Sequence, residues 1–320
     1  MKGSDRVATP ISASPVWKSS AQDFARDLDL STEEVTNLLE LAREMKRHPA
    51  RFRTALSGRY LSLLFEKPSL RTRLTFELAM KQLGGDSIVS NGPIAAREPL
   101  KDVARNLDRW TNGIVARTFL QSTIDELAHW SAVPVINALS DLFHPCQALA
   151  DVLTLQEHLG ELRGKKIAFL GDGNNVAHSL MITATRLGMD FALAHPEGYA
   201  PSSEVVSDAA AGAAISGASI TITTEPQEAL AGAHAVYTDV WASMGQEDQA
   251  GERQKRFEGY QVSAERFAQA RPDAVFMHCL PAKRGQETTD EVMESPRSVV
   301  FDQAENRLHA QKALLLMILG

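Results

Sequence analysis

Short apolar runs that alternate with helical patterns are the feature that most restricts how this 320-residue chain can fold. The first half carries such runs at 60–65, 87–90, 113–117 and 133–137, and the second half carries them at 166–170, 191–194, 219–223, 235–237, 274–277 and 299–301. Near-continuous apolar strands separated by helices are typical of parallel sheets that are covered on both faces. The sequence therefore predicts an α/β protein with two doubly wound parallel-sheet domains.

The helical patterns also predict how the two halves are connected. Residues 145–159 have the pattern of one helix that links the halves. Residues 304–319 have the pattern of a terminal helix that packs back on the first domain. We therefore expect one domain to comprise 1–147 together with 304–320, and the other to comprise 148–303.

Composition and charge exclude several classes of protein. Hydrophobic residues make up 44% of the chain and charged residues 23%, as in soluble globular proteins. The net charge of −7 and the lack of a long basic run give no support to a nucleic-acid partner. The longest apolar stretch, 313–319, is too short to cross a membrane, and 1–20 lacks the apolar core of a signal peptide. The two cysteines have no metal-binding spacing to the nine histidines, which indicates no metal site and a reduced, cytoplasmic setting.

Cationic side chains gather where strands of the first half end. The first predicted strand is followed by EKPSLRTR, in which Ser69 is a candidate helix N-cap. A helix N-terminus exposes free N–H groups and the positive end of the helix dipole, so it suits a phosphate. Arg71 and Thr72 would add a guanidinium and a hydroxyl. Arg73 and Glu77 stand one helical turn apart and are expected to form a surface ion pair.

Two further strand ends contribute donors to the same region. Arg117 ends the third apolar run, and the sequence HPCQ begins the linking helix. Arginine, histidine and glutamine side chains can each donate to a phosphate oxygen or a polarised carbonyl. His144 and Gln147 are therefore candidate site residues beside Arg117, whereas Cys146 is expected to be an inert buried thiol.

Two polar motifs of the second half also follow apolar runs. DVWASMG occupies 239–245, and HCLP occupies 278–281. Open α/β sheets bind ligands at the carboxyl ends of their strands. A carboxylate, a hydroxyl, a glycine-bounded turn and a thiol at such an edge indicate a small-molecule site, although either motif alone is explained as well by an ordinary loop.

The sequence GDGNNVA is similar to a dinucleotide-binding turn, because it follows a strand and opens a helix. However, Val176 occupies the third glycine position, and Glu197 meets the spacing of the ribose-binding acid only loosely. Asparagine amides in the turn can instead bind a substrate carboxylate. A nucleotide-dependent oxidoreductase, which rests on Gly171 and Gly173 alone, therefore remains an alternative.

Taken in order, these motifs resemble those of the carbamoyltransferase family. The matching segments are SLRTR at 69–73, HPCQ at 144–147, GDGNN at 171–175, DVWASMG at 239–245, HCLP at 278–281 and ENRLH at 305–309. The resemblance extends from about residue 24 to 319, which is nearly the whole chain. The Ser-Met-Gly sequence and the cysteine of HCLP resemble the ornithine branch of the family in particular.

This resemblance implies an activity. The δ-amine of L-ornithine would attack the carbonyl carbon of carbamoyl phosphate, giving L-citrulline and phosphate. The resemblance further implies that no metal or organic cofactor is needed. It also implies a homotrimer, or an assembly of trimers, with sites at subunit boundaries.

The resemblance implies a role for each matching residue. Ser69, Leu70 (through its N–H), Arg71, Thr72 and Arg117 would hold the phosphate; His144, Gln147, Cys279, Leu280 and Arg307 would complete the carbamoyl phosphate site; Asn175, Asp239, Ser243 and Met244 would bind ornithine. The residues with an implied catalytic role are Arg71, Arg117, His144 and Cys279. Cys279 would lie by the δ-amine, near enough to help it lose its proton.

One departure from the family pattern concerns a loop of the first half. Family members often carry a glutamine a few residues before a Glu-Pro pair, and it reaches the carbamoyl phosphate site across a subunit boundary. Pro93 occupies that position here, so this contact is either rebuilt or absent. Two further alternatives remain open. One is a carbamoyltransferase for a related amine, such as acylated ornithine or putrescine, and the other is a regulatory binding protein without turnover.

Overall fold

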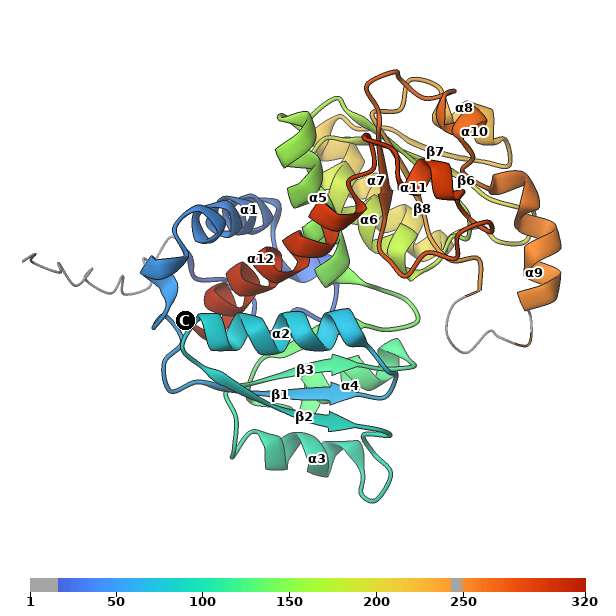
Figure 1. The fold of residues 1–320 in the computed structure, drawn as a ribbon. Coiled ribbons are helices and arrows are strands. Elements are labelled where there is room, and N and C mark those ends of the chain that lie inside the picture. Colours follow the sequence, from blue (N-terminus) through green and yellow to red (C-terminus); the bar gives the residue numbers. More distant parts are fainter. Residues whose placement is uncertain (1–16, 243–247, 249) are drawn as a thin grey trace, which may run out of the picture.

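The computed structural model describes residues 17–242, 248 and 250–320, which form two α/β domains with one parallel sheet each (Figure 1). This confirms the predicted fold class. Throughout these described ranges, no helix combines the length and the apolar character that crossing a membrane requires.

The first domain is built on a four-stranded sheet with the order β2-β1-β3-β4. Its strands are β1 (Tyr60–Phe65), β2 (Asp86–Asn91), β3 (Gly113–Arg117) and β4 (Val135–Leu139), and its helices are α2 (Leu70–Gln82), α3 (Leu100–Leu107) and α4 (Gln121–Trp130). Every residue of β3 is buried, and α2 and α3 lie on opposite sides of the sheet (Figure 1). The winding direction reverses between β1 and β3, so the carboxyl ends of these strands form a ligand-binding switch point.

The second domain is built on a five-stranded sheet with the order β7-β6-β5-β8-β9. Its strands are β5 (Lys166–Leu170), β6 (Asp190–Ala194), β7 (Ile220–Thr223), β8 (Ala235–Thr238) and β9 (Val275–His278), and its helices are α6 (Asn175–Arg186), α7 (Ser203–Ser216), α8 (Pro226–Leu230), α9 (Ala250–Phe257), α10 (Ala264–Phe267) and α11 (Asp290–Met293). All neighbouring strands are parallel. The switch point of this sheet lies between β5 and β8.

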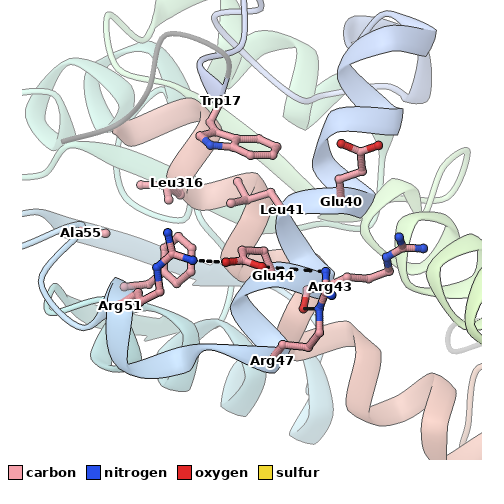
Figure 2. Close-up of a pocket in the computed structure, with 10 residues that line it drawn as sticks. Trp17, Glu40, Leu41, Arg43, Glu44, Arg47, Arg51, Ala55 and Leu316 are labelled. Carbon is pink, nitrogen blue, oxygen red and sulfur yellow. Dashed lines mark hydrogen bonds and ion pairs between the residues drawn. The ribbon is translucent and has the colours of Figure 1, made fainter. Parts of the chain in front are cut away.

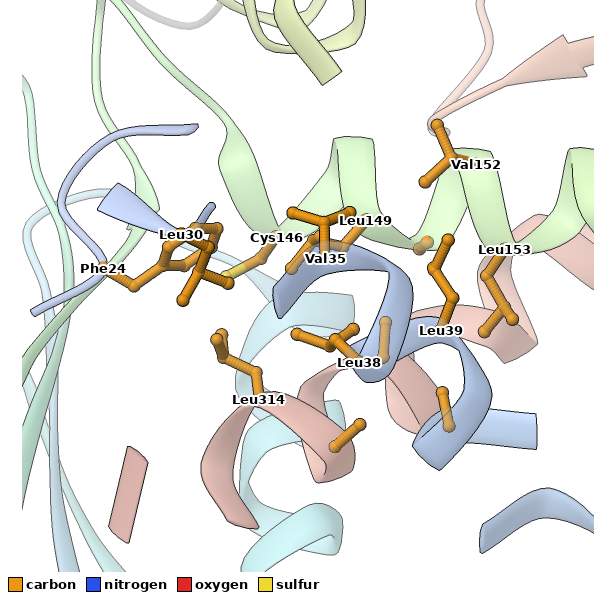
Figure 3. Close-up of a cluster of buried hydrophobic side chains, with 14 of the residues drawn as sticks. Phe24, Leu30, Val35, Leu38, Leu39, Cys146, Leu149, Val152, Leu153 and Leu314 are labelled. Carbon is orange, nitrogen blue, oxygen red and sulfur yellow. The ribbon is translucent and has the colours of Figure 1, made fainter. Parts of the chain in front are cut away.

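Two long helices join the domains. α5 (Pro145–Leu159) runs from β4 to β5, and α12 (Val300–Leu319) returns to pack against α1 (Thr32–Arg47), α2 and α5. Figure 3 shows Leu38 of α1, Leu149 of α5 and Leu314 of α12 in one buried apolar cluster. Every residue of α5 from 145 to 155 is buried, which explains why its apolar residues are not confined to one stripe.

The strand expected at 299–301 is wrong. The chain is already helical there, because α12 begins at Val300, before the start predicted for the terminal helix. Ser298 makes only an isolated parallel bridge with Phe276 of β9. The β-branched and aromatic side chains at this helix start mimic a strand in the sequence.

Candidate functional site

The carboxyl ends of both sheets border one cavity of about 760 Å³. Its walls are the ends of β3 and β4, the segments that follow β1, β4, β5, β6, β8 and β9, the starts of α2, α5 and α6, and one residue each of α9 and α12. The predicted residues that line it are Ser69, Leu70, Arg71, Thr72, Arg117, His144, Asn175, Asp239, Cys279, Leu280 and Arg307. Ser243 and Met244 lie outside the described residues, and Pro93 does not line the cavity.

The first-domain wall of the cavity consists of its lining residues from 67–72, 117, 139–144 and 307. Three arginines make this wall cationic. Arg71 lies in the first turn of α2, Arg117 ends β3, and Arg307 comes from α12. Burial, followed by the neighbouring charges of Arg307 and Arg71, lowers the pKa of Arg117 to about 10. The Nε atoms of Arg117 and Arg307 are buried without a hydrogen-bond partner among the described residues. Because unpaired buried charge is costly, this wall favours an anionic ligand.

The start of α2 forms part of the same wall. Ser69 occupies the N-cap position, as predicted, but its side chain caps no N–H group of the described helix. The N–H groups of the first turn are therefore available to a ligand. Thr72 Oγ1 accepts a 2.6 Å hydrogen bond from Arg307 Nη2, which ties α12 to this wall. By contrast, Arg73 Nε donates to Glu77 Oε1 at 2.7 Å, which is the predicted surface pair.

His144 lies where the linking helix meets the cavity. Its backbone N–H donates to Ser179 Oγ at 2.9 Å, which fixes the start of α5 to α6. Burial, followed by the charges of Arg307 and Arg117, lowers the pKa of the imidazole well below its usual value. The ring is therefore neutral near pH 7, and its Nδ1 has no partner among the described residues. A neutral imidazole can donate one hydrogen bond to a carbonyl oxygen.

Two further residues of the HPCQ motif are buried behind the cavity. Gln147 departs from expectation, since it does not line the cavity and its Nε2 donates to Asp151 Oδ1 at 2.8 Å. Cys146 Sγ donates to Asn137 O at 3.4 Å. Burial raises the pKa of Cys146 to about 12, so this thiol is protonated and unreactive near neutral pH.

The second-domain wall consists of the cavity's lining residues from 172–178, 198–200, 239–242, 253 and 279–283. Several polar groups of this wall already form hydrogen bonds within the protein. Asp239, just after β8, accepts hydrogen bonds from Asn174 Nδ2 at 2.9 Å and from Cys279 Sγ at 3.1 Å. Asn175 Nδ2 donates to Ser140 O at 2.6 Å and so connects α6 with the segment after β4. Burial, followed by the charge of Asp239, raises the pKa of Cys279 well above its usual value. The thiol is therefore a donor to Asp239 near neutral pH and not a free base.

The HCLP turn has an unusual backbone that is held by buried polar contacts. Leu280 has a φ of 58°, in the left-handed region that residues other than glycine rarely adopt, and the Leu280–Pro281 bond is cis. The N–H of Leu280 donates to His278 Nδ1 at 2.9 Å, and His278 Nε2 lies 3.2 Å from Glu287 Oε1. These contacts fix the turn so that Cys279 lines the cavity.

The same turn brings three potential metal ligands together. One ligand atom each from Asp239, His278 and Cys279 lies within 4.8 Å of the others. Both ring nitrogens of His278 are already engaged, however, by Leu280 N–H and by Glu287. A cation would have to displace one of these contacts, so the donor set fits a structural role better than a resident metal.

The GDGNN turn is shaped for packing and for capping a helix. A side chain at Gly173 would clash with the backbone, because its Cβ would lie 2.2 Å from the nitrogen of Pro201. The Asn174 side chain accepts from the N–H groups of Val176 and Ala177 at 3.0 and 3.1 Å. These N–H groups at the start of α6 are those that a bound pyrophosphate would need. The oxidoreductase alternative therefore loses its structural basis.

Sequence reasoning did not identify several charged or basic residues of the cavity, among them Lys67, Asp172, His178 and Arg253. Arg253 of α9 pairs with Asp172 at 2.6 Å and lies over the ring of Tyr199 at 4.9 Å from its centroid. Lys67 and Asp172 lie within motifs that the sequence did mark. His178 and Arg253 lie inside helices, where no strand end marks them.

A second, smaller cavity of about 320 Å³ lies beside α1 and η3 (Pro49–Phe52) (Figure 2). It is lined by Trp17, Leu316 and side chains of α1, including Glu44, which pairs with Arg51. None of the predicted site residues lines it. The cavity at the sheet edges is therefore the candidate active site.

Two family matches cover the two domains. Residues 22–157 match the carbamoyl-P binding domain of aspartate/ornithine carbamoyltransferase, and residues 163–318 match the Asp/Orn binding domain of the same family. The chain belongs to the aspartate/ornithine carbamoyltransferase family. The first match contains Arg71 and Arg117 of the cationic wall, and the second contains Asp239 and Cys279.

Named carbamoyltransferases resemble the chain over most of its length. "Ornithine carbamoyltransferase, anabolic" from Pyrococcus furiosus is 48% identical over 297 residues, which is 91% of this chain and 94% of the relative. Ornithine carbamoyltransferase from Rhodococcus opacus is 49% identical over 301 residues, which is 93% and 96%. The solved structure of the Pyrococcus furiosus enzyme has a TM-score of 0.92 at 47% identity, covering 94% of this chain and 98% of that one. Acetylornithine transcarbamylase in complex with acetylcitrulline has a TM-score of 0.85 at 34% identity, covering 93% and 99%.

Proposed function

We propose that the chain is an enzyme that transfers the carbamoyl group of carbamoyl phosphate to the δ-amine of L-ornithine, giving L-citrulline and phosphate. The neutral amine attacks the carbonyl carbon, the bond from that carbon to the phosphate oxygen breaks, and the amine loses one proton. Negative charge develops on the carbonyl oxygen and on the departing phosphate. The site therefore needs fixed donors for one substrate and zwitterion-binding groups for the other.

The observation that carries this proposal is the wall of buried donors that lack partners among the described residues. Arg71, Arg117 and the first turn of α2 would bind the phosphate, together with Ser69, Leu70 N–H and Thr72. Neutral His144 would donate to the carbonyl oxygen, and Arg307 would stabilise the charge that develops there. Each fixed donor of this kind contributes about 3–4 kcal/mol in comparable sites.

The second wall would bind ornithine. Asp239 and Ser243 would take the α-ammonium, and Asn175 with the N–H of Met244 would take the α-carboxylate. The contact between Cys279 Sγ and Asp239 supports placing the δ-amine beside this pair. Because the thiol is protonated, its role would be to orient the amine, and the proton would leave toward Asp239 or solvent. No metal or organic cofactor takes part in this reaction.

A homotrimer belongs to the same proposal. Leu70, Leu74 and Leu78 form an apolar stripe on α2, with exposed fractions of 71%, 45% and 44%. Ile88 of the adjacent strand β2 is 65% exposed. An exposed apolar patch of this kind is typical of a subunit interface. It begins beside the phosphate wall, so a neighbouring subunit would approach the site. Light scattering after size-exclusion chromatography tests this, and a monomer would contradict it.

The domain limits and the setting are also proposals. We assign 1–147 with 304–320 to carbamoyl phosphate and 148–303 to ornithine, on the support of the two separate sheets and the packing of α12 on α1 and α2. The two free cysteines support a reduced, cytoplasmic setting. The description "anabolic" of the Pyrococcus furiosus relative supports a role in arginine synthesis.

The proposed reaction is tested by measuring citrulline and phosphate in the same samples of purified protein supplied with both substrates. After subtraction of the phosphate that carbamoyl phosphate releases spontaneously in a protein-free sample, we expect the two products in equal amounts, and neither product when ornithine is left out. Phosphate release without citrulline would indicate a phosphatase. Binding of both substrates without any product would support the regulatory alternative instead.

A further inference from the structure

A single buried carboxylate connects the two walls of the cavity. Asp151 lies on α5 and is fully buried. Its Oδ1 accepts hydrogen bonds from Gln147 Nε2 at 2.8 Å and from Gln303 Nε2 at 2.7 Å. None of the three residues lines the cavity, so these contacts form behind its surface.

The first contact fixes the orientation of the Gln147 amide. With Nε2 directed at Asp151, the remaining group of that amide is the acceptor Oε1. This Oε1 is buried and has no hydrogen-bond partner among the described residues. Gln147 lies one helical turn from His144, which lines the cavity. Because a buried acceptor without a donor is costly, the position suits a ligand that brings an N–H group.

The second contact reaches the other wall. Gln303 Nε2 also donates to the hydroxyl of Tyr237 at 2.9 Å, and Gln303 Oε1 accepts the backbone N–H of His278 at 3.0 Å. His278 begins the HCLP turn that carries Cys279. The same carboxylate therefore orients one amide near the carbamoyl side and another that supports the ornithine side.

We propose that Asp151 is a positioning residue that holds the Gln147 amide with its oxygen toward the substrate, so that the site recognises the NH₂ group of carbamoyl phosphate. This inference rests on the proposed function. A carbamoyl group differs from an acetyl group in that NH₂, which needs an acceptor, whereas both carry the carbonyl oxygen that His144 would meet. Burial raises the pKa of Asp151 to about 7, but with any proton on Oδ2 its Oδ1 still accepts from Gln147 Nε2. That contact keeps Gln147 from turning its own NH₂ toward the ligand. Through its hold on Gln147, Asp151 thus makes the site prefer carbamoyl phosphate to other acyl phosphates.

Two variants and their combination test this role. Asp151→Asn presents an amide to Gln147 and lets the Gln147 amide turn. Gln147→Glu alone sets two carboxyl groups against each other. In the double variant Q147E/D151N, the new amide can donate to one carboxylate oxygen and leave the other as the acceptor toward the substrate. The readouts are kcat and KM for carbamoyl phosphate, and the inhibition constants of acetyl phosphate and of inorganic phosphate.

For each single variant, we expect kcat/KM for carbamoyl phosphate to fall about tenfold or more, with little change in inhibition by acetyl phosphate or inorganic phosphate. The preference for carbamoyl over acetyl phosphate should recover in the double variant. Should Asp151→Asn fail to fold, the comparison of Gln147→Glu with the double variant gives the same test. Unchanged preference in the single variants, or no recovery in a folded double variant, overturns the role of Asp151. Absence of citrulline with the unmodified protein would instead overturn the proposed function.

Discussion

The two walls of the cavity differ in how their polar groups are satisfied. On the first-domain wall, Arg117 Nε, Arg307 Nε and His144 Nδ1 have no hydrogen-bond partner among the described residues. On the second-domain wall, Asp239 already accepts from Asn174 and from Cys279. The first wall is therefore arranged for an anion before any ligand arrives. The second wall must exchange internal hydrogen bonds for substrate contacts. We expect carbamoyl phosphate to bind the protein in the absence of ornithine, and ornithine to bind well at the second wall only after carbamoyl phosphate has occupied the first wall.

The largest effect is expected at the first wall. Arg71→Ala should lower kcat/KM for carbamoyl phosphate by about 100- to 1,000-fold, because a donor to the departing phosphate is lost. The melting temperature should change little, since the guanidinium faces the cavity and not the core. Arg73→Ala is the matched control, because this arginine pairs with Glu77 on the surface of the same helix. Similar losses in both variants would show that the phosphate site is misplaced.

The next largest effect is expected on protein stability, at the buried carboxyl group of Asp27. Burial raises the pKa of Asp27 to about 6, and its Oδ2 accepts from Ser179 Oγ at 2.6 Å. Because the pKa is raised, Asp27 is protonated in the native state and ionised in the unfolded state between about pH 4 and pH 6. The contribution of protonated Asp27 to the stability of the folded protein is therefore fully present below about pH 4 and is lost as pH rises through 6. Between pH 4.5 and pH 7.5, the ionisation of Asp27 should lower the free energy of unfolding of the unmodified protein by about 2 kcal/mol. The Asp27→Asn variant should not show this decrease.

Denaturant unfolding of both proteins at those two pH values measures the difference. The unmodified protein should lose stability relative to the variant as pH rises. Parallel pH dependences would show that Asp27 is ionised in the folded protein at both pH values.

The second wall should control the choice of amine. Asp239→Asn should lower the preference for ornithine over N-acetylornithine by about tenfold, because the charge that favours the α-ammonium is removed. Inhibition by inorganic phosphate serves as the internal control, since it reports the first wall. A loss of phosphate affinity together with amine preference would mean that the walls are not independent. The ratio of kcat/KM values for the two amines is the measurement.

The smallest expected effect is on the shape of the pH profile. Activity should rise from pH 7 to pH 9, because the ornithine δ-amine resembles a lysine side chain and attacks only when neutral. The pKa of His144 is lowered, so the ring is neutral throughout this range. The pKa of Cys279 is raised, so its thiol stays protonated. Cys279→Ser should therefore lower the rate and leave the rise in place. A flat profile in that variant would assign the rise to the thiol.

The fold could be predicted because fully buried parallel strands leave a direct record in the sequence. The runs at 60–65, 113–117 and 166–170 are strands with the same bounds in the structure. The error at 299–301 arose because the two buried valines and the exposed Phe301 at this helix start are residue types that are common in strands. Tertiary packing of α12 on α5 and β9 decides between the two, and no local pattern contains that information.

The sequence could predict those site residues that lie at the end of a predicted strand or directly after it. Arg117 and Asp239 follow strands whose carboxyl ends meet at one edge, so their convergence follows from topology. The contact of Gln303 with Asp151 joins residues 152 positions apart inside two helices. The burial of Gln147 behind the cavity is likewise set by the crossing of helices. Neither feature has a local signature in the sequence.

In the proposed function, one wall selects carbamoyl phosphate and the other selects an amino acid with a free α-ammonium and α-carboxylate. The most direct test is carbamoylation of ornithine, N-acetylornithine, putrescine and aspartate side by side by the purified protein. N-Acetylornithine is the critical competitor, because an acetylornithine transcarbamylase shares the fold at 34% identity. We predict that ornithine is the best substrate and that the other three are poor. Putrescine lacks the α-carboxylate and N-acetylornithine lacks the α-ammonium charge, so each leaves polar groups of the second wall unpaired. Aspartate presents a carboxylate where Cys279 would meet the δ-amine. Comparable rates with N-acetylornithine or putrescine would contradict the assignment of Asp239 and Asn175 to ornithine.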